Sequence, residues 1–193
     1  MRQVRLLLLA VLLYGCGKDS APVDQTTKGG TTAEALGILK EFPDTPGLVK
    51  TEKRDAKDRI QTTGYLMNGK KEGSWVDYFE NGSIKTVTTY VQDKKEGLFM
   101  EFNYTNQLLK RYFMHNDARH GEYKEYNSSL LKEERYYENG KQEGVAIIFY
   151  DNGKTMEEGY YKNGFRDGVS KWYDQNGNLT ITYEYKKGEL IKK

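Results

Sequence analysis

Residues 65–85 read YLMNGKKEGSWVDYFENGSIK, and this stretch decides the fold because similar stretches follow it along the chain. The later copies are YVQDKKEGLFMEFNYTNQLLK (90–110), FMHNDARHGEYKEYNSSLLK (113–132), YYENGKQEGVAIIFYDNGK (136–154) and YYKNGFRDGVSKWYDQNGNL (160–179). Their equivalent glycines are spaced by 24, 24, 23 and 24 residues, at Gly73, Gly97, Gly121, Gly144 and Gly168. A fixed period of this length indicates a repeat protein in which each unit packs on its neighbours.

Each unit holds two runs rich in Tyr, Phe, Trp, Thr and Ile, separated by turn residues. Asn-Gly pairs occupy many turns, at 68–69, 81–82, 139–140, 152–153, 163–164 and 176–177. Asn-Gly between apolar runs predicts a hairpin, because both residues tolerate the positive φ of a type I′ turn. We therefore expect an all-β fold, an antiparallel β-meander of about ten to twelve strands. It would consist of about five 24-residue hairpin repeats in an elongated, single-layer, twisted sheet.

The period also predicts the domain boundaries. We expect a repeat domain at 48–193 with regular units at 64–188. Residues 45–63 lie one period before the first unit and are predicted to be a degenerate cap, because a terminal repeat lacks one neighbour. Residues 16–47 contain all three prolines and many Thr and Gly residues, which is typical of a flexible tether. Within the tether, apolar residues at every third position are compatible with a short helix, at Ala33, Leu36, Leu39 and Phe42.

The N-terminus has the pattern of an export signal. Arg2 and Arg5 precede an apolar run of eight residues, which fits a signal peptide over 1–15 and is shorter than the ~20 residues that span a bilayer. Leu13-Tyr14-Gly15-Cys16 resembles the bacterial lipoprotein signal box, although Tyr14 stands where a small residue is usual. The resemblance implies an acylated Cys16 that anchors the chain to a membrane of the cell envelope, the outer rather than the inner. An ordinary secretory signal with a chance Cys is the alternative.

The repeat pattern resembles the MORN repeat, and in particular the 24-residue variant of YwqK-type antitoxin components. The matching positions are Tyr65, Asn68-Gly69, Lys70, Glu72-Gly73, Trp75, Tyr78 and Asn81-Gly82. The likeness covers about residues 60–190 and departs at His120, which replaces the acidic residue before Gly121. It implies a scaffold. The family label adds an alternative, an antitoxin or immunity component that neutralises a toxin by direct protein binding.

Composition excludes several classes of function. The 193 residues include 30 Lys+Arg and 28 Asp+Glu, and without Arg2 and Arg5 the two counts are equal at 28. A neutral chain lacks the basic surface of a nucleic-acid binder. We expect neither catalysis nor a cofactor, because no catalytic motif is present. His115 and His120, the two histidines, are interpreted as surface residues, since a metal site needs three or four ligands.

Two features remain as candidates for partner binding. A one-layer sheet cannot bury both faces, so we expect an exposed aromatic face that binds a protein or an envelope glycan. Its predicted members are Trp75, Tyr78, Phe99, Tyr123, Tyr126, Phe149, Trp172 and Tyr173; structural cross-strand pairing is the alternative. The recurrent K-x-E-G turn is either a ladder of charge for docking or ordinary turn chemistry, in which the acid caps backbone N–H groups.

Overall fold

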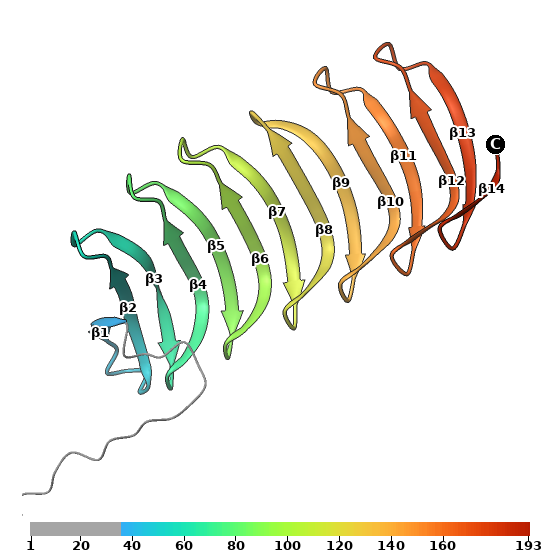
Figure 1. The fold of residues 1–193 in the computed structure, drawn as a ribbon. Helices are drawn as coiled ribbons and strands as arrows, with labels where there is room; N and C mark the ends of the chain where they lie inside the picture. Colours follow the sequence, from blue (N-terminus) through green and yellow to red (C-terminus); the bar gives the residue numbers. More distant parts are fainter. Residues whose placement is uncertain (1–35) are drawn as a thin grey trace, which may run out of the picture. The chain divides into compact units, whose positions relative to one another are not determined.

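The computed structural model describes residues 36–193, which form one open antiparallel sheet of fourteen strands. The strands lie side by side in sequence order, so each pairs only with the strands before and after it (Figure 1). Their bounds are β1 Gly37–Glu41, β2 Leu48–Arg54, β3 Ile60–Met67, β4 Lys70–Tyr78, β5 Ile84–Val91, β6 Lys94–Phe102, β7 Leu108–His115, β8 Ala118–Asn127, β9 Leu130–Glu138, β10 Lys141–Phe149, β11 Thr155–Lys162, β12 Phe165–Tyr173, β13 Leu179–Lys186 and β14 Glu189–Lys192. The predicted all-β meander is confirmed.

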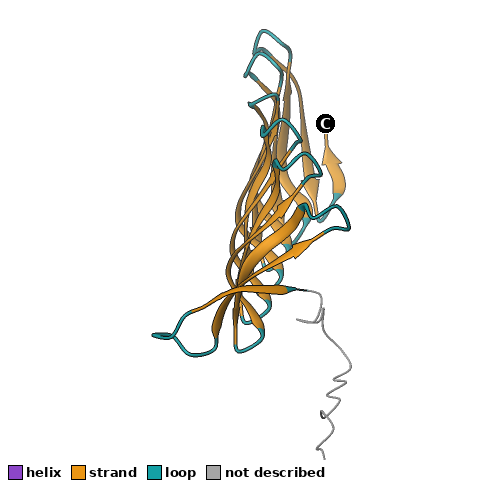
Figure 2. Cartoon of the chain, turned by 90° about the vertical axis from the view of Figure 1, so that its left-hand side faces the viewer, coloured by secondary structure: helices purple, strands orange, loops and turns teal. Residues whose placement is uncertain are grey.

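The described part of the chain consists of strands and the turns that join them (Figure 2). Residues 36–193 contain no apolar helix of membrane-spanning length. The predicted signal peptide, Cys16 and the start of the tether lie outside the described residues.

The sheet begins earlier than predicted, at Gly37 instead of residue 48. The helix expected through Leu36, Leu39 and Phe42 is wrong where the structure describes it, because residues 37–41 form β1 and pair with β2. The edge of a sheet presents unpaired N–H and C=O groups, and pairing with them outweighs a weak three-residue periodicity. Together with the hairpin of β2 and β3, this raises the strand count above the expected ten to twelve.

The Asn-Gly turns are of two kinds. At 68–69, 139–140 and 163–164 both residues have positive φ, as a type I′ turn requires. At 81–82, 152–153 and 176–177 only the glycine does, so the type I′ prediction is wrong for these three. Here the chain makes a longer loop, in which the N–H of Gly82 donates to the carbonyl of Phe79 at 2.9 Å. Alternate hairpins therefore have short and long turns.

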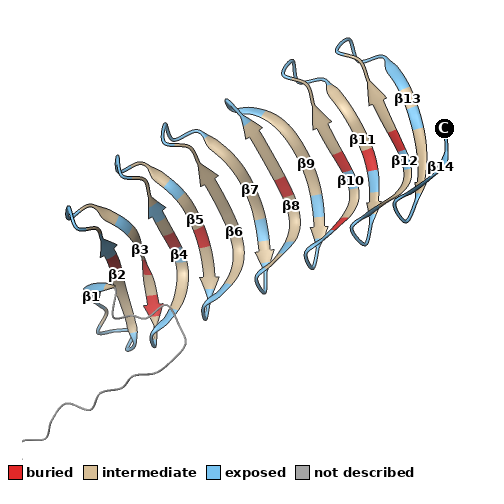
Figure 3. Cartoon of the chain, in the orientation of Figure 1, coloured by how far each residue is buried: buried red, intermediate tan, exposed pale blue. Residues whose placement is uncertain are grey.

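Cross-strand pairing, continued across the register shifts between β3 and β4 and between β9 and β10, aligns one residue from each of β2 to β13 across the sheet, hereafter the central row. Its members are Thr51, Gly64, Trp75, Thr88, Phe99, Tyr112, Tyr123, Arg135, Ala146, Gly159, Ser170 and Tyr183. Within residues 36–193 the row includes eight of the eleven buried residues, and Figure 3 shows buried segments on β2 to β5, β8 and β10 to β12. Successive side chains of a strand point to opposite sides, so the row defines a row face and a reverse face. The core of this single layer is thus a line of residues.

Candidate binding surface

The eight predicted aromatic residues do not share a face. Trp75, Phe99 and Tyr123 belong to the central row, and Trp172, two residues after Ser170, shares the row face. The other four each lie three residues after a central-row position, which places them on the reverse face: Tyr78, Tyr126, Phe149 and Tyr173. Trp75 and Tyr123 are also only 4% and 6% exposed, and the other six are half-buried. The prediction of one exposed aromatic face made of these residues is therefore wrong.

The row-face rings contact one another and the cations above them. Phe99 stacks on Tyr112 and Tyr112 on Tyr123, with ring centroids 4.5 and 5.6 Å apart. The guanidinium of Arg119 lies over both tyrosine rings, at 5.1 Å from each centroid. Burial raises the pKa of Tyr112 and of Tyr123, so both hydroxyls stay neutral. These contacts are the structural cross-strand pairing that was the alternative interpretation.

The side chain just before the glycine of each K-x-E-G turn, acidic in every unit except at His120, accepts a hydrogen bond from the next unit along the sheet. Glu72 accepts a hydrogen bond from the N–H of Gln92 at 3.0 Å, and Glu143 accepts one from Asn163 at 2.6 Å. The remaining units repeat the bond as Glu96–Asn116, His120–Asn139 and Asp167–Lys187. These side chains satisfy turn N–H groups, which favours turn chemistry over a free charge ladder.

The two histidines belong to this line of turns. Their ring centroids are 5.7 Å apart, and His115 contacts Glu96 at 2.8 Å through Nδ1. That contact lowers the pKa of Glu96, with help from the N–H of Asn116. Within residues 36–193 no three His, Cys, Asp or Glu side chains gather as metal ligands. The pair is thus part of the packing of adjacent turns.

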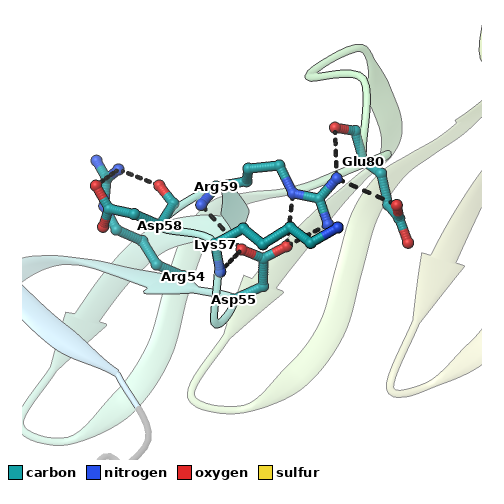
Figure 4. Close-up of polar contacts among 6 residues, drawn as sticks. All are labelled: Arg54, Asp55, Lys57, Asp58, Arg59 and Glu80. Atoms are coloured by element: carbon teal, nitrogen blue, oxygen red, sulfur yellow. Dashed lines mark hydrogen bonds and ion pairs between the residues drawn. The ribbon is translucent and has the colours of Figure 1, made fainter.

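The loop between β2 and β3 holds a second polar cluster (Figure 4). The Asp55 carboxylate accepts backbone hydrogen bonds from Lys57 and Arg59 at 2.8 and 3.0 Å, and a side-chain bond from Arg59 at 2.7 Å. Arg59 also reaches the Glu80 carboxylate of the next loop at 3.1 Å. The Arg59 side chain and these N–H groups hold the pKa of Asp55 below its usual range. The cluster fastens two loops and satisfies its own charges, so it is not a ligand site.

The reverse face carries an exposed apolar surface that sequence reasoning missed. Five large apolar side chains at one level of this face are 40–49% exposed, hereafter the apolar stripe: Phe113, Tyr136, Val145, Tyr160 and Val169. Each is adjacent in sequence to a central-row residue, which puts all five on the reverse face at one level. They come from β7 and from β9 to β12, and Val145 pairs directly with Tyr160. Four of the five lie on the consecutive strands β9 to β12, and Phe113 is separated from them by one strand, β8. Exposed apolar side chains on neighbouring strands are typical of interaction surfaces.

The apolar stripe ends in polar residues at the same level of the sheet. On β5 the position is Thr89, whose hydroxyl donates to the carbonyl of Leu98 at 3.0 Å. On β13 it is Glu184, directly opposite Val169. The repeat therefore does not force this level to be apolar, and the stripe is a local property of the middle and later units.

Ion pairs border the apolar stripe on the same face. Glu122 takes the stripe position on β8, opposite Tyr136. Lys124 bridges Glu122 and Glu134 at 2.9 and 2.8 Å, and Arg111 also pairs with Glu122. Lys124 and Arg111 lower the pKa of Glu122, which keeps the carboxylate charged. These charges lie between Phe113 and Tyr136, and protein interfaces commonly combine apolar side chains with charged residues beside them.

Three segments of the chain match the family model described as MORN repeat variant: residues 71–92, 142–163 and 166–187. No curated protein matches the chain. One solved structure with some likeness is described as "Crystal Structure of TarM"; it is 15% identical, with a TM-score of 0.35. The likeness covers 54% of this chain and 21% of that one, and at this TM-score it carries no argument.

Proposed function

We propose that this protein, whose sheet carries MORN-variant repeats, is a non-catalytic scaffold that binds a protein partner through the apolar stripe. The observation that carries the proposal is the exposure of five apolar side chains at one level of one face, between Thr89 and Glu184. Single exposed apolar side chains are ordinary on protein surfaces, whereas several at one level of neighbouring strands are typical of an interaction site.

The first unit supports the proposal, because its stripe position is already covered. Tyr65 follows central-row Gly64 and so lies at the level of the apolar stripe. The ring of Phe42, from the connection between β1 and β2, lies 6.2 Å from the Tyr65 ring. An apolar side chain from another segment therefore fits on this level of the sheet. We propose that the partner supplies equivalent side chains to the open positions.

The spacing of the rings favours a protein over a glycan. Within the apolar stripe the rings of Phe113, Tyr136 and Tyr160 lie on β7, β9 and β11. The strand between each two of them presents Glu122 or Val145 at that level. No two rings of the stripe are thus cross-strand neighbours. Such a surface suits the mixed apolar and charged side chains of a protein better than the flat faces of a sugar chain.

Site-specific photocrosslinking tests this proposal. A benzophenone amino acid replaces Tyr136, Tyr160 or, as a control, Tyr104, which is 68% exposed but lies outside the stripe. The full chain is made in a Gram-negative host and irradiated in cells. The expected result is one protein adduct of the same mass from Tyr136 and Tyr160 and not from Tyr104. No adduct, or the same adduct from all three positions, contradicts the proposal.

We further propose that an acylated Cys16 holds the scaffold at the cell envelope, on the outer membrane. Support comes from the sequence box around Cys16, and one acyl chain gives only marginal anchoring, so two or three chains are expected. Labelling cells with an alkyne fatty acid tests this, with Cys16→Ala as the comparison. Label and membrane association should both be lost in the variant. A soluble, unlabelled wild type would contradict the anchor and would favour the antitoxin alternative.

A further inference from the structure

The two outer strands of the sheet expose apolar side chains as neighbouring pairs. Ile38 and Leu39 of β1 are 62% and 49% exposed, and Leu190 and Ile191 of β14 are 53% and 57% exposed. Among residues 36–193, β1 pairs only with β2 and β14 only with β13. Each strand therefore has a row of backbone N–H and C=O groups without a strand partner in that range. Such edges are templates for another strand.

The side chains of the two edges are complementary on both faces. Ile38 pairs with central-row Thr51, and Leu190 pairs with Tyr185, so both apolar side chains lie on the row face. Lys40 pairs with Lys50 and Glu189 with Lys186, which places this opposite-charge pair on the reverse face. The Lys40 ammonium lies over the Phe42 ring at 4.8 Å and remains at the surface.

The strand directions fit as well. All neighbours in the sheet are antiparallel, so odd-numbered strands run one way and even-numbered strands the other. Each outer strand has one extra residue where its register shifts, Leu39 in β1 and Ile191 in β14, so Ile38 and Lys40 face opposite sides although they are two residues apart. If a second copy continued the sheet after β14, its β1 would be antiparallel to β14. Opposing the two extra-residue sites with Leu39 next to Leu190 brings Ile38 to Ile191 and Lys40 to Glu189. Opposite charges and apolar pairs across antiparallel strands are stabilising.

We propose that copies of this chain associate head to tail, with β1 of one copy adding to β14 of the next. The contact is heterologous, so it leaves an open edge at each end and allows chains of more than two copies. It uses the sheet edges and leaves the apolar stripe on the reverse face free.

Cysteine crosslinking tests the arrangement in the full chain. Two differently tagged copies, one Ile38→Cys and one Leu190→Cys, are expressed together and treated with a short bismaleimide. The expected product is the mixed dimer, and a chain that carries both changes should give a ladder of multimers. Within one copy the two edges are about 60 Å apart, at ~4.8 Å per strand, so an internal link is excluded. The wild-type chain, whose one cysteine is Cys16, shows whether any crosslink forms through Cys16.

Two outcomes overturn the inference. One is crosslinked dimers from Ile38→Cys alone or from Leu190→Cys alone, because the same edge of two copies would then pair with itself. The other is no mixed dimer at all. A charge reversal gives an independent test by sedimentation: Lys40→Glu should weaken association about fivefold, and Lys40→Glu with Glu189→Lys should restore it. Equal association of all three chains contradicts the proposed register.

Discussion

Two glycines of the central row, Gly64 and Gly159, differ in what an added methyl group would meet. Gly64 lies beside Trp75, and a methyl group at Gly64 would overlap the indole ring, whose Nε1 donates to the carbonyl of Tyr65 at 3.0 Å. At Gly159 a methyl group would instead meet the Arg166 guanidinium at 2.9 Å and the Ser170 hydroxyl at 3.2 Å. The ring is fixed by packing, whereas the end of an arginine side chain can move.

We therefore expect Gly64→Ala to lower the free energy of unfolding by about 2 kcal/mol, the usual cost of overpacking. Gly159→Ala, the matched change in the same row, should cost less than about 1 kcal/mol because the arginine adjusts. Urea unfolding of both variants measures the difference. Equal losses of unfolding free energy would contradict the view that the Trp75 ring is held in place by packing whereas the Arg166 side chain can move.

The Asp55 carboxylate should make stability depend on acidity. Its pKa is lowered in the folded state, chiefly by Arg59, so its contribution is complete above the usual value of about 4 and is lost as the pH falls through the lowered value. Asp55→Asn keeps an oxygen acceptor for the loop N–H groups but removes the charge. The deficit of the variant should be clear at pH 7 and should shrink below pH ~4 in urea unfolding. Asp58→Asn, at an 88% exposed side chain, is the control; a deficit that is independent of pH contradicts the account.

At the scale of single elements, turn conformation and turn sequence disagree at the turn between β8 and β9. Ser128 and Ser129 have φ values of 49° and 71°, as the short Asn-Gly turns do. Serine is strained there, because a side chain in the left-handed region costs roughly 1–2 kcal/mol. Replacing the pair by Asn-Gly should raise the free energy of unfolding by about 1 kcal/mol. The reverse change, Asn163-Gly164 to Ser-Ser, should lower it comparably, and no effect at both turns would refute the argument.

The same elements show how far sequence reasoning reaches. Glycine spacing and Asn-Gly turns predicted the strands from β4 onward, because backbone conformation there depends on a few local residues. They could not predict β1, which is a strand only because β2 offers an edge. They also could not tell the turn at 68–69 from that at 81–82, since loop length decides which residues need positive φ.

The candidate site was harder to predict than the fold. The motif aromatic residues Trp75 and Tyr78 were assigned to one face, although an odd separation in a strand puts them on opposite faces. The apolar stripe was overlooked for a related reason. Phe113, Tyr136 and Tyr160 recur at 23 and 24 residues, but their shared face appears only when the alternation is counted from the buried central row.

At the scale of the whole repeat domain, the contacts that hold the sheet together and the proposed binding surface lie at different levels of one sheet. The central row and the turn bonds between units hold the layer together, and each unit depends on its neighbours. The side chains of the apolar stripe take no part in the turn bonds between units, so the proposed contact with a partner would not disturb those bonds. We propose that such a scaffold recognises its partner through one level of side chains while the rest of the sheet supports them.

The most direct test of this account measures the partner adduct after charge is placed in the stripe. Val145→Lys with Val169→Lys buries two unpaired ammonium groups in a protein contact, so the Tyr160 photocrosslink should fall at least about tenfold. Val91→Lys is the matched control, because Val91 is 46% exposed against 49% and 45% for the stripe valines, and its adduct should equal that of wild type. Circular dichroism should show all three chains folded alike. An undiminished adduct in the Val145→Lys, Val169→Lys chain would contradict binding through the apolar stripe.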